Sequence, residues 1–473
     1  MVSPIDLQSH FSIEELKAAF LRLEEARTDK FDTSNIRVPM GADGIEYKDF
    51  KKNLDRNLRE ISTAVLRGSY TFYPLRQVDI PKDKKDKSKG TRTLSIARIR
   101  DVLVQKQLYR ALYDRTQDWF GIPKYDRVSV AYRRKKSAHD AIRDIWRDYR
   151  RGYRFALDAD IEKFFDKLNH NYLMSVVDRL LGPETHERQL IWRYINTRYI
   201  CHSEYKDIVW QSYFMQHKPP KPQRRTEGVP QGGVLSGMLA NLYLHEFDKW
   251  IVDDLGHNTQ LRYYRYADDF VILTKSMSEA EMIYEPVRQK LNEMHLTIHA
   301  LDSGKTRLVE IPKHKLEFLG FRITAHHIQV KPANICRFKE RFSESIKRIE
   351  KHTTEDPEKR VAELVKYYSN SKIIGPPDDC PICHMPRRRY NWISFFAPVI
   401  TDMRQLHALD VWMRKETERY VFRQHQIKVK NRKALIKHNM TSLIKEYRRY
   451  KRGQFCQCEP EDHPDVIDVG TDA

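Results

Sequence analysis

The spacing of apolar residues divides the chain near residue 330. Before that point, segments with apolar residues at helical spacing alternate with short runs rich in β-branched and aromatic residues, which predict strands. After it, helical spacing continues alone, so the pattern predicts a mixed α+β part followed by a helical part. We expect helices over 12–25, 47–66, 101–119, 138–150, 234–253, 278–294, 336–352, 357–370, 402–425 and 432–450, and strands over 71–82 and 91–96, at the start of 154–166, on either side of 268–269 and within 305–330.

Local signals support several of these elements. Ser12 and Glu15 have the spacing of a capping box, which marks the start of a helix. The runs 71–82 and 91–96 are joined by the polar, glycine-ended segment KDKKDKSKG, which predicts a hairpin with a basic tip, although such a charge run is also typical of a solvated loop. The stretch 196–228 is polar and contains KPPKPQRR, so we expect an exposed insertion or loop there.

Charge narrows the class of partner. Lys and Arg outnumber Asp and Glu by 85 to 65, for a net charge of +20, and a field of this sign favours a polyanion such as nucleic acid. An anionic membrane is the rival, but the basic residues are spread along the chain and no apolar run approaches the ~20 residues of a spanning helix. The start, MVSPIDLQSHFSIEELKAAF, lacks the layout of a signal peptide, and six cysteines are too few for a disulfide scaffold. We therefore expect a cytoplasmic protein that binds nucleic acid and no membrane.

Two adjacent aspartates interrupt the apolar run YRYADDFVIL. Asp268 and Asp269 repel each other at the end of a strand, which destabilises the fold unless a cation binds them. Mg²⁺ is held by one or two carboxylates together with substrate phosphates, so the pair is a candidate magnesium site. For an isolated pair of aspartates, a β-turn that uses Asp for its own backbone hydrogen bonds is the simpler explanation.

Asp160, in LDADIEKFFD, is the second clue, because it also ends an apolar strand. If this strand and the one at Asp268 pair in one sheet, the carboxylates converge, and two ions about 3.5–4 Å apart would clamp the attacking and leaving oxygens of a phosphoryl transfer. A third element is GVPQGGVLSGMLANLYLHEFD at 228–248, whose glycines permit close approach of a ligand before a helix with small residues. Taken alone, this segment is only a turn before a buried helix.

In this order, the blocks LDADIEKFFD, VPQGGVLSGMLANLYLHEFD and RYADDFVIL resemble the reverse transcriptases of bacterial retroelements, particularly the group II intron enzymes. The resemblance covers roughly residues 41–330. Further matching blocks are IPK (80–82), TRTLSI (91–96), RVSVAYRRKKSAHDAI (127–142), GKT (304–306) and FLGF (318–321).

This resemblance implies an α+β right-hand polymerase with fingers and a ferredoxin-like palm over residues 71–330. A helical extension over 1–70 would precede it. An α-helical thumb, or X-like domain, is implied over 331–435 with a cysteine-bearing insertion at 371–390, and a C-terminal helix and tail over 436–473.

The resemblance also implies roles for individual residues. Asp160 and Asp268 would be the main Mg²⁺ ligands of a two-ion site, with Asp269 in support and the backbone carbonyl of Ile161 as a further ligand. Phe165 would block a ribose 2′-OH, and Gln231 would lie along the nucleotide sugar and the template base. The cations expected at the phosphates are Lys82, Arg92 and Lys305, the last at the leaving pyrophosphate.

Four of these five nucleotide contacts have a structural alternative. Lys82 and Arg92 are also compatible with solvated surface positions, Phe165 with a core position and Lys305 with a structural lysine.

Some features depart from the family pattern. Gly237 stands where relatives usually carry proline, which predicts a looser helix start. The stretch 197–226 looks longer than the usual link and could contact a dedicated RNA or a partner protein. The spacing of Cys380, Cys383, Cys456 and Cys458 predicts a structural Zn²⁺, with His384 and His463 as substitute ligands. We expect Cys201 and Cys336 to be ordinary buried thiols.

The resemblance predicts an RNA-directed DNA polymerase that adds dNTPs to a 3′ end. Its partners would be an RNA template, its DNA product and a protein partner or second copy of the chain. Because no fused endonuclease is evident, a stand-alone enzyme of antiphage defence that works with a noncoding RNA is the preferred interpretation. A group II intron-type enzyme or maturase, or an RNA-binding maturase-like protein with little polymerase activity, is the alternative.

Overall fold

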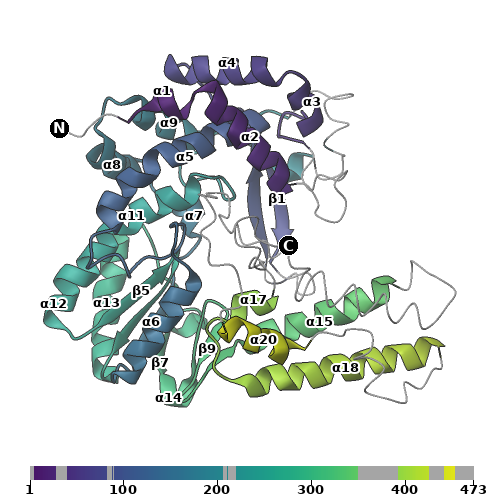
Figure 1. Ribbon diagram of the computed structural model, residues 1–473. Coiled ribbons are helices and arrows are strands. Elements are labelled where there is room, and N and C mark those ends of the chain that lie inside the picture. The colour runs from purple at the N-terminus through teal and green to yellow at the C-terminus, as the bar shows by residue number, and fades with distance from the viewer. Residues whose placement is uncertain are drawn as a thin grey trace.

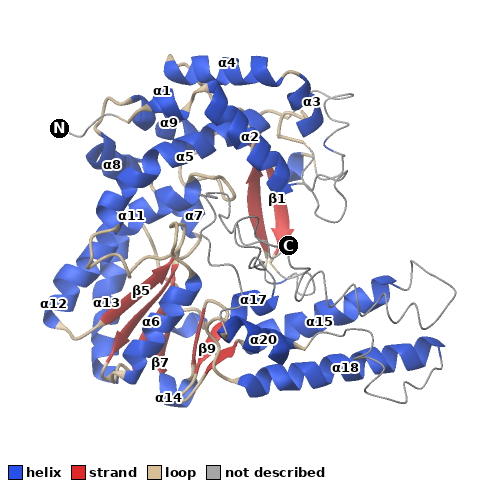
Figure 2. Cartoon of the chain, viewed as in Figure 1, coloured by secondary structure: helices blue, strands red, loops and turns tan. Residues whose placement is uncertain are grey.

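In the computed structural model, a four-stranded antiparallel sheet organises the chain (Figures 1 and 2). The strands follow the order β5 (Arg262–Tyr266), β6 (Asp269–Thr274), β3 (Phe155–Asp160) and β7 (Arg307–Glu310). The structure describes residues 5–27, 40–82, 88, 90–205, 210, 220–349, 392–425 and 442–452.

Both faces of this sheet are buried. Leu157 and Ile272 pack into one hydrophobic core, whereas their neighbours Ala156 and Val271 pack into another. A strand covered on both faces reads as a continuous apolar run rather than an alternating one, which explains the FVIL sequence of β6.

The first core joins the sheet to the N-terminal half of the chain. Helix α13 (Met277–Glu293) packs on β3 and β6, and α11 (Ser236–Trp250) packs on α8 (His170–Leu181) and α5 (Ile99–Phe120). The core continues without interruption to Phe20 and Leu58. The remaining helices on this side are α1 (Leu7–His10), α2 (Ile13–Arg27), α3 (Tyr47–Lys52), α4 (Leu54–Leu66) and α9 (His186–Ile195).

The second core lies on the opposite face of the sheet. It contains α6 (Ala138–Arg150), the small sheet β10-β9-β8 and the C-terminal helices. The Gln405 side chain donates to the Val330 carbonyl at 2.9 Å and accepts from the Val330 amide at 2.8 Å, so it covers the edge of β10. The elements of this core are β8 (Leu316–Phe318), β9 (Phe321–Ile323), β10 (Ile328–Val330), α15 (Pro332–Ile349), α17 (Trp392–Phe396), α18 (Met403–His425) and α20 (Leu443–Lys451).

A third sheet has the order β2-β1-β4 and stands apart from the other two (Figure 2). Strands β1 (Leu75–Pro81) and β2 (Thr91–Ile96) form the expected antiparallel hairpin, and β4 (Tyr199–Ile200) pairs in parallel with β1. The short remaining elements are α7 (Phe164–Lys167), η2 (His202–Glu204), η3 (Ile251–Leu255), α12 (Gly256–Asn258), η4 (Leu301–Ser303) and α14 (Ile311–His314).

Most expected elements are confirmed, with four corrections. The helix expected over 432–450 begins only at Leu443, because Ser442 has an extended backbone and caps it, and residues 432–441 lie outside the described residues. The helix expected over 47–66 is broken at Asn53, where the backbone leaves helical geometry and the Asn57 side chain donates to the Phe50 carbonyl at 3.0 Å. Helices α8 and α9 occupy a segment for which no element was expected. The α-helix expected to end at 253 ends at Trp250, and a π-helical turn over Ile251–Leu255 follows it directly. The helix expected over 357–370 lies outside the described residues.

None of the helices in the described part of the chain combines the length and the apolar composition needed to cross a bilayer.

The second core includes Val309 and Phe338, which lie on either side of the boundary expected near 330. The domain limits therefore stay predictions.

A buried carboxylate anchors the segment before β1 to α5. Asp101 is fully buried and accepts from the Tyr70 hydroxyl at 2.5 Å, the Tyr73 amide at 2.9 Å and the Arg98 side chain at 2.9 Å. Burial raises the pKa of Asp101, and the charge of Arg98 opposes that effect. The buried carboxylate is stabilised because all three of its hydrogen-bond partners are in place together.

We expect Asp101→Ala to lower the free energy of unfolding by about 3–5 kcal/mol, because it leaves the mostly buried Arg98 guanidinium without its partner. Asp118→Ala on the exposed face of the same helix is the matched control and should change stability by less than about 0.5 kcal/mol. Denaturant unfolding followed by circular dichroism measures both. Equal effects of the two changes would contradict the anchoring role.

Candidate active site

The turn between β5 and β6 presents Asp268. Tyr266 and Asp269 pair across the two strands, which leaves Ala267 and Asp268 as the two residues of the turn. Ala267 has a φ of 58°, a conformation that residues other than glycine adopt rarely and at an energetic cost. The turn therefore has a defined and strained geometry at the position that carries the carboxylate.

Strand register brings Asp160 to the same place. Asp160 on β3 lies directly opposite Asp269 on β6, so their side chains emerge on the same face of the sheet. Asp158, two residues earlier on β3, shares this face and is paired with Arg307 of β7. The three aspartates expected from the sequence are thus neighbours at one end of the sheet.

The carboxylates perturb one another. Burial, followed by the charge of Asp160, raises the pKa of Asp268 to about 6. Asp269 is reached by solvent but is surrounded by protein, and this desolvation, with the charges of Asp268, Asp160 and Asp158, raises its pKa to about 8. Burial and mutual repulsion thus both disfavour the ionised form of these two carboxyl groups.

Cationic side chains surround these carboxylates. Lys305 Nζ lies 3.1 Å from Asp160 Oδ2 and 3.0 Å from His299 Nε2. The other ring nitrogen of His299 lies 3.3 Å from Glu162, so His299 and Glu162 belong to the site although the sequence did not single them out. Arg92 lies opposite Ile80 on the hairpin, and its charge, like that of Lys305, lowers the pKa of Asp268 against the effect of burial.

The glycine-rich loop at 228–233 joins the sheet to the hairpin. Gly228 has a φ of 75°, and a Cβ there would lie 2.6 Å from the Asp166 carbonyl. The Val229 amide donates to the Phe165 carbonyl at 2.7 Å, and the Gln231 carbonyl accepts from the Ser95 amide of β2 at 2.8 Å. The loop therefore places Gln231 against the hairpin, and it places Phe165 beside the loop itself.

Gly237 makes room for an aromatic ring. A Cβ at this position would lie 2.4 Å from the Tyr132 ring, and Tyr132 in turn meets the Phe165 ring edge-on at 6.3 Å. Helix α11 begins at Ser236, whose hydroxyl donates to the Pro230 carbonyl and lies 2.7 Å from the Tyr194 hydroxyl, and the expectation of a looser helix start stays a prediction.

Comparison with known proteins identifies the family. The model of the family described as "Reverse transcriptase (RNA-dependent DNA polymerase)" matches residues 80–323, just over half of the 473-residue chain. The chain belongs to the reverse transcriptase family. It therefore carries an RNA-directed DNA polymerase domain, and the blocks quoted from the sequence lie within or beside the matched region.

This reverse transcriptase is similar to two curated proteins over different lengths. It is 27% identical to Protein YkfC of Escherichia coli (strain K12) over 336 residues, which span 64% of this chain and 80% of YkfC. It is 28% identical to the group II intron-encoded protein LtrA of Lactococcus lactis subsp. cremoris over 201 residues, but these span 42% of this chain and only 28% of LtrA.

Among solved structures, a chain of the partial Cas6-RT-Cas1–Cas2 complex is 20% identical, with 62% of this chain and 42% of that chain covered. Its TM-score of 0.33 is too low to support an argument about fold or function.

The family implies catalysis with a divalent metal such as Mg²⁺, and the residues of this reverse transcriptase fit such an ion. No group of three or more His, Cys, Asp or Glu side chains in the described ranges is arranged as a metal cage. Mg²⁺ does not require one, because it takes one or two carboxylates and completes its shell with water and substrate phosphates. Ile161 bridges to Ile298 through the carbonyl of Asp160 and the amide of Glu162, so that bridge leaves the Ile161 carbonyl available.

A buried arginine supports the turn of this reverse transcriptase. Arg265 is fully buried, donates through Nε to Asp248 at 2.8 Å and through Nη1 to the Ala267 carbonyl at 3.0 Å. Asn241 also accepts from Arg265 at 3.0 Å, and Asp248 accepts from the Tyr263 hydroxyl at 2.9 Å. Sequence reasoning missed this network. The available signal was a charged residue in each of two largely apolar blocks, Asp248 in LANLYLHEFD and Arg265 in LRYYRYADD.

The cysteine expectations have two outcomes. The proposed zinc ligands Cys380, Cys383, Cys456 and Cys458, with His384 and His463, lie outside the described residues, so zinc stays a prediction that the family match does not imply. The expectation of buried thiols is wrong for the other two cysteines, because Cys336 is exposed and Cys201 is partly exposed. Among the described side chains of α15, Phe338 and Phe342 are buried, so Cys336 lies off their packed face.

We expect Arg265→Met to lower the free energy of unfolding by about 3–5 kcal/mol, since it leaves the buried Asp248 carboxylate without its cation. Arg262→Met, an exposed position on the same strand, should cost less than about 1 kcal/mol. Chemical denaturation of the two variants provides the measurement. The double change Asp248→Leu with Arg265→Met should recover part of the loss, and failure of that recovery would show that the charge pair is not the cause.

Proposed function

We propose that this reverse transcriptase copies RNA into DNA with two Mg²⁺ ions held by Asp160 and Asp268, with Asp269 and the Ile161 carbonyl in support. One observation carries the proposal: the register of β3 and β6 sets Asp160 opposite Asp269, next to Asp268 on the turn. Bound divalent ions would favour the ionised carboxylates, activate the attacking 3′-OH and neutralise the leaving pyrophosphate.

The residues of the chain position the nucleotide in this proposal. Lys82 and Arg92 extend from the β1–β2 hairpin toward the triphosphate, and both are exposed and can therefore bind it. Lys305 occupies the place of a cation beside Asp160, and it turns to the pyrophosphate when substrate enters. Such cations stabilise the charge that develops on the leaving phosphates.

Phe165 and Gln231 select the nucleotide in this proposal. Phe165 is partly buried against the first core and meets Tyr132 edge-on, so its ring is held in place beside the loop. A fixed ring at this point excludes a ribose 2′-OH and favours dNTPs. Gln231 lies where the loop meets β2 and would contact the sugar and the template base.

The arrangement of elements supports a right-hand polymerase. In this proposal the β1–β2 hairpin and the helices near it are the fingers, the four-stranded sheet is the ferredoxin-like palm, and α15, α18 and α20 form the thumb (Figure 1). Template and primer would lie between them and be held mostly through the backbone, which suits the net charge of +20.

For the biological role, we propose antiphage defence with a dedicated noncoding RNA, supported by the 197–226 stretch, which looks longer than the family's usual link. A group II intron-type role is the second candidate, favoured by the similarity to LtrA. Phage plating on cells with the wild type or Asp268→Ala tests the first role. Equal plaque numbers, together with co-purified intron RNA, would favour the second.

Primer extension tests the catalytic proposal. We expect Asp268→Asn, which keeps shape and removes charge, to lower dNTP incorporation on an RNA template by at least about 100-fold, more than loss of an outer partner of a metal ligand usually costs. Asp254→Asn, an exposed position outside the site, is the matched control and should extend primers normally. If wild type and Asp268→Asn extend equally, the carboxylates do not carry the reaction.

Nucleotide competition tests the role of Phe165. Phe165→Ala should lower the ratio of kcat/KM for dNTP over rNTP by about 10–100-fold, because the change opens space for a 2′-OH. Phe164→Leu, at the buried neighbouring position, should lower both values together. A parallel loss of both activities in Phe165→Ala would show that the residue is only part of the core.

A further inference from the structure

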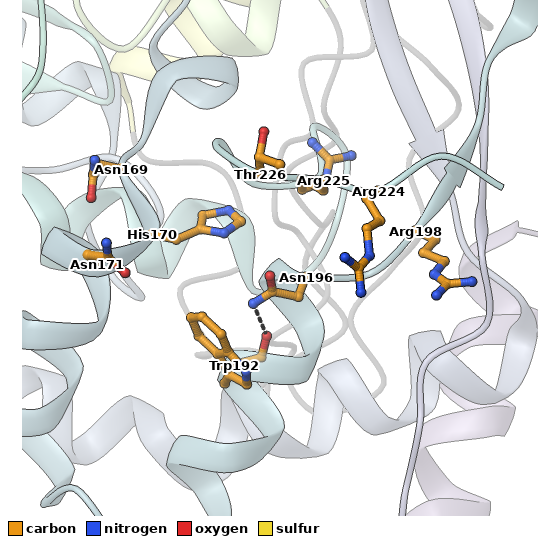
Figure 3. A pocket seen from close by; sticks show the side chains of 9 residues that line it. All are labelled: Asn169, His170, Asn171, Trp192, Asn196, Arg198, Arg224, Arg225 and Thr226. Atoms are coloured by element: carbon orange, nitrogen blue, oxygen red, sulfur yellow. Dashed lines mark hydrogen bonds between the residues drawn. The ribbon is translucent and has the colours of Figure 1, made fainter.

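A cavity of about 540 Å³ opens between the start of α8, the end of α9 and the segment 224–226 (Figure 3). It does not include the three aspartates of the candidate active site. Its volume falls in the range that binds a ligand of nucleotide size. Six of its lining residues carry the inference: Asn171, Trp192, Asn196, Arg198, Arg224 and Arg225.

The charged side chains that line this cavity are all cationic. Three arginines line it, and no Asp or Glu side chain of the described residues does. Arg225 is the most constrained of them, because its Nε and Nη2 atoms are buried and have no hydrogen-bond partner within the described part of the structure. Burial also lowers the pKa of Arg225. Buried donors without acceptors are costly, and a phosphate would satisfy them.

An aromatic ring lies open beside these cations. Trp192 is 40% exposed, and its ring meets the His170 ring at 6.5 Å. Asn196 is partly exposed, donates to the Trp192 carbonyl at 2.9 Å and lies between Trp192 and Arg224 in the view of Figure 3, and Asn171 adds an exposed amide. An open ring next to guanidinium groups is the arrangement with which proteins bind single-stranded nucleic acid, since a base stacks on the ring while cations hold the backbone.

The cavity adjoins the glycine-rich loop at 228–233. His170 Nε2 lies 2.7 Å from the Gly228 carbonyl, three residues before Gln231. The charges of Arg225 and of Lys82 on the hairpin both lower the pKa of Asp166, against the larger effect of burial. The cavity arginine and the hairpin lysine therefore lie near the same carboxylate. A strand bound in the cavity would therefore lie close to the candidate active site without occupying it.

We propose that this cavity is a second nucleic-acid site that binds a nucleotide unit of single-stranded RNA, with the base on Trp192 and the phosphates on Arg198, Arg224 and Arg225. The inference goes beyond the proposed polymerase reaction and depends on it only for the choice of RNA. The amide groups of Asn171 and Asn196 can hydrogen-bond a 2′-OH or a base edge. An acidic peptide would use the arginines but not the open ring.

Salt dependence of binding tests the arginines. The full-length protein is titrated into a 5′-fluorescein-labelled 12-nucleotide oligouridine RNA without Mg²⁺ or dNTPs, and anisotropy is measured over a salt series. For Arg198→Ala with Arg224→Ala we expect binding weaker by about tenfold and a salt slope smaller by about 1.4, or about 0.7 for each lost phosphate contact. Arg56→Ala with Arg59→Ala removes two exposed arginines of α4 and should change neither value appreciably.

The aromatic contact has its own variants and readout. Trp192→Ala should weaken RNA binding by about tenfold, whereas Trp192→Phe, which keeps a stacking surface, should retain most of the affinity. Oligouridine containing 4-thiouridine should photocross-link to the peptide that contains Trp192. Thermal unfolding of each variant is the control for folding, and each should unfold at the temperature of the wild type.

The outcomes separate this proposal from the polymerase proposal. An unchanged salt slope, cross-links elsewhere only, or competition by polyglutamate as strong as by RNA would overturn the second site while wild-type primer extension still succeeded. Failure of primer extension with normal RNA binding at Trp192 would instead overturn the polymerase proposal alone. If UMP competes at concentrations as low as those of the RNA, the cavity binds a free nucleotide. That result would overturn the assignment of the cavity to an RNA strand.

Discussion

The pairing of Arg265 with Asp248 underlies the geometry of the candidate active site. A charge buried this completely is tolerated only when its partner and its remaining hydrogen bonds are all present. Asp248, Asn241 and the Ala267 carbonyl supply those bonds, so α11 and the β5–β6 turn have one position relative to each other. The strained Ala267 is held by this network, and the orientation of Asp268 depends on it.

The sheet also divides the molecule into two packed regions. On one face it joins the N-terminal helices, and on the other it joins the helices after residue 330. The carboxylates lie at one end of the sheet, at the end of β3 and at the turn before β6. This position explains how a strongly polar site coexists with the apolar run Phe270 to Leu273 of β6.

Charge is uneven between the two candidate sites. At the carboxylate end of the sheet, burial and then the neighbouring carboxylates raise the pKa of Asp268 to about 6 and of Asp269 to about 8, and Lys305 is held there by Asp160. The cavity beside the glycine-rich loop is lined by three arginines, and Nε and Nη2 of Arg225 are buried without an acceptor among the described residues. A divalent cation suits the first site and a phosphate the second, and a complex of protein, metal and nucleic acid would neutralise both.

The sequence by itself determined the features that depend on neighbouring residues. The hairpin over 71–96, the helix over 138–150, the strand before Asp160 and the turn at Asp268 all follow from local spacing, and the ordered blocks indicated the family. Only the tertiary structure decided which distant residues meet. Asp248 pairs with Arg265, Lys305 with Asp160, Gly237 accommodates Tyr132, and Trp192 shares a cavity with Arg224. The physical reason is that such contacts are set by the packing and register of whole elements, which no local pattern encodes.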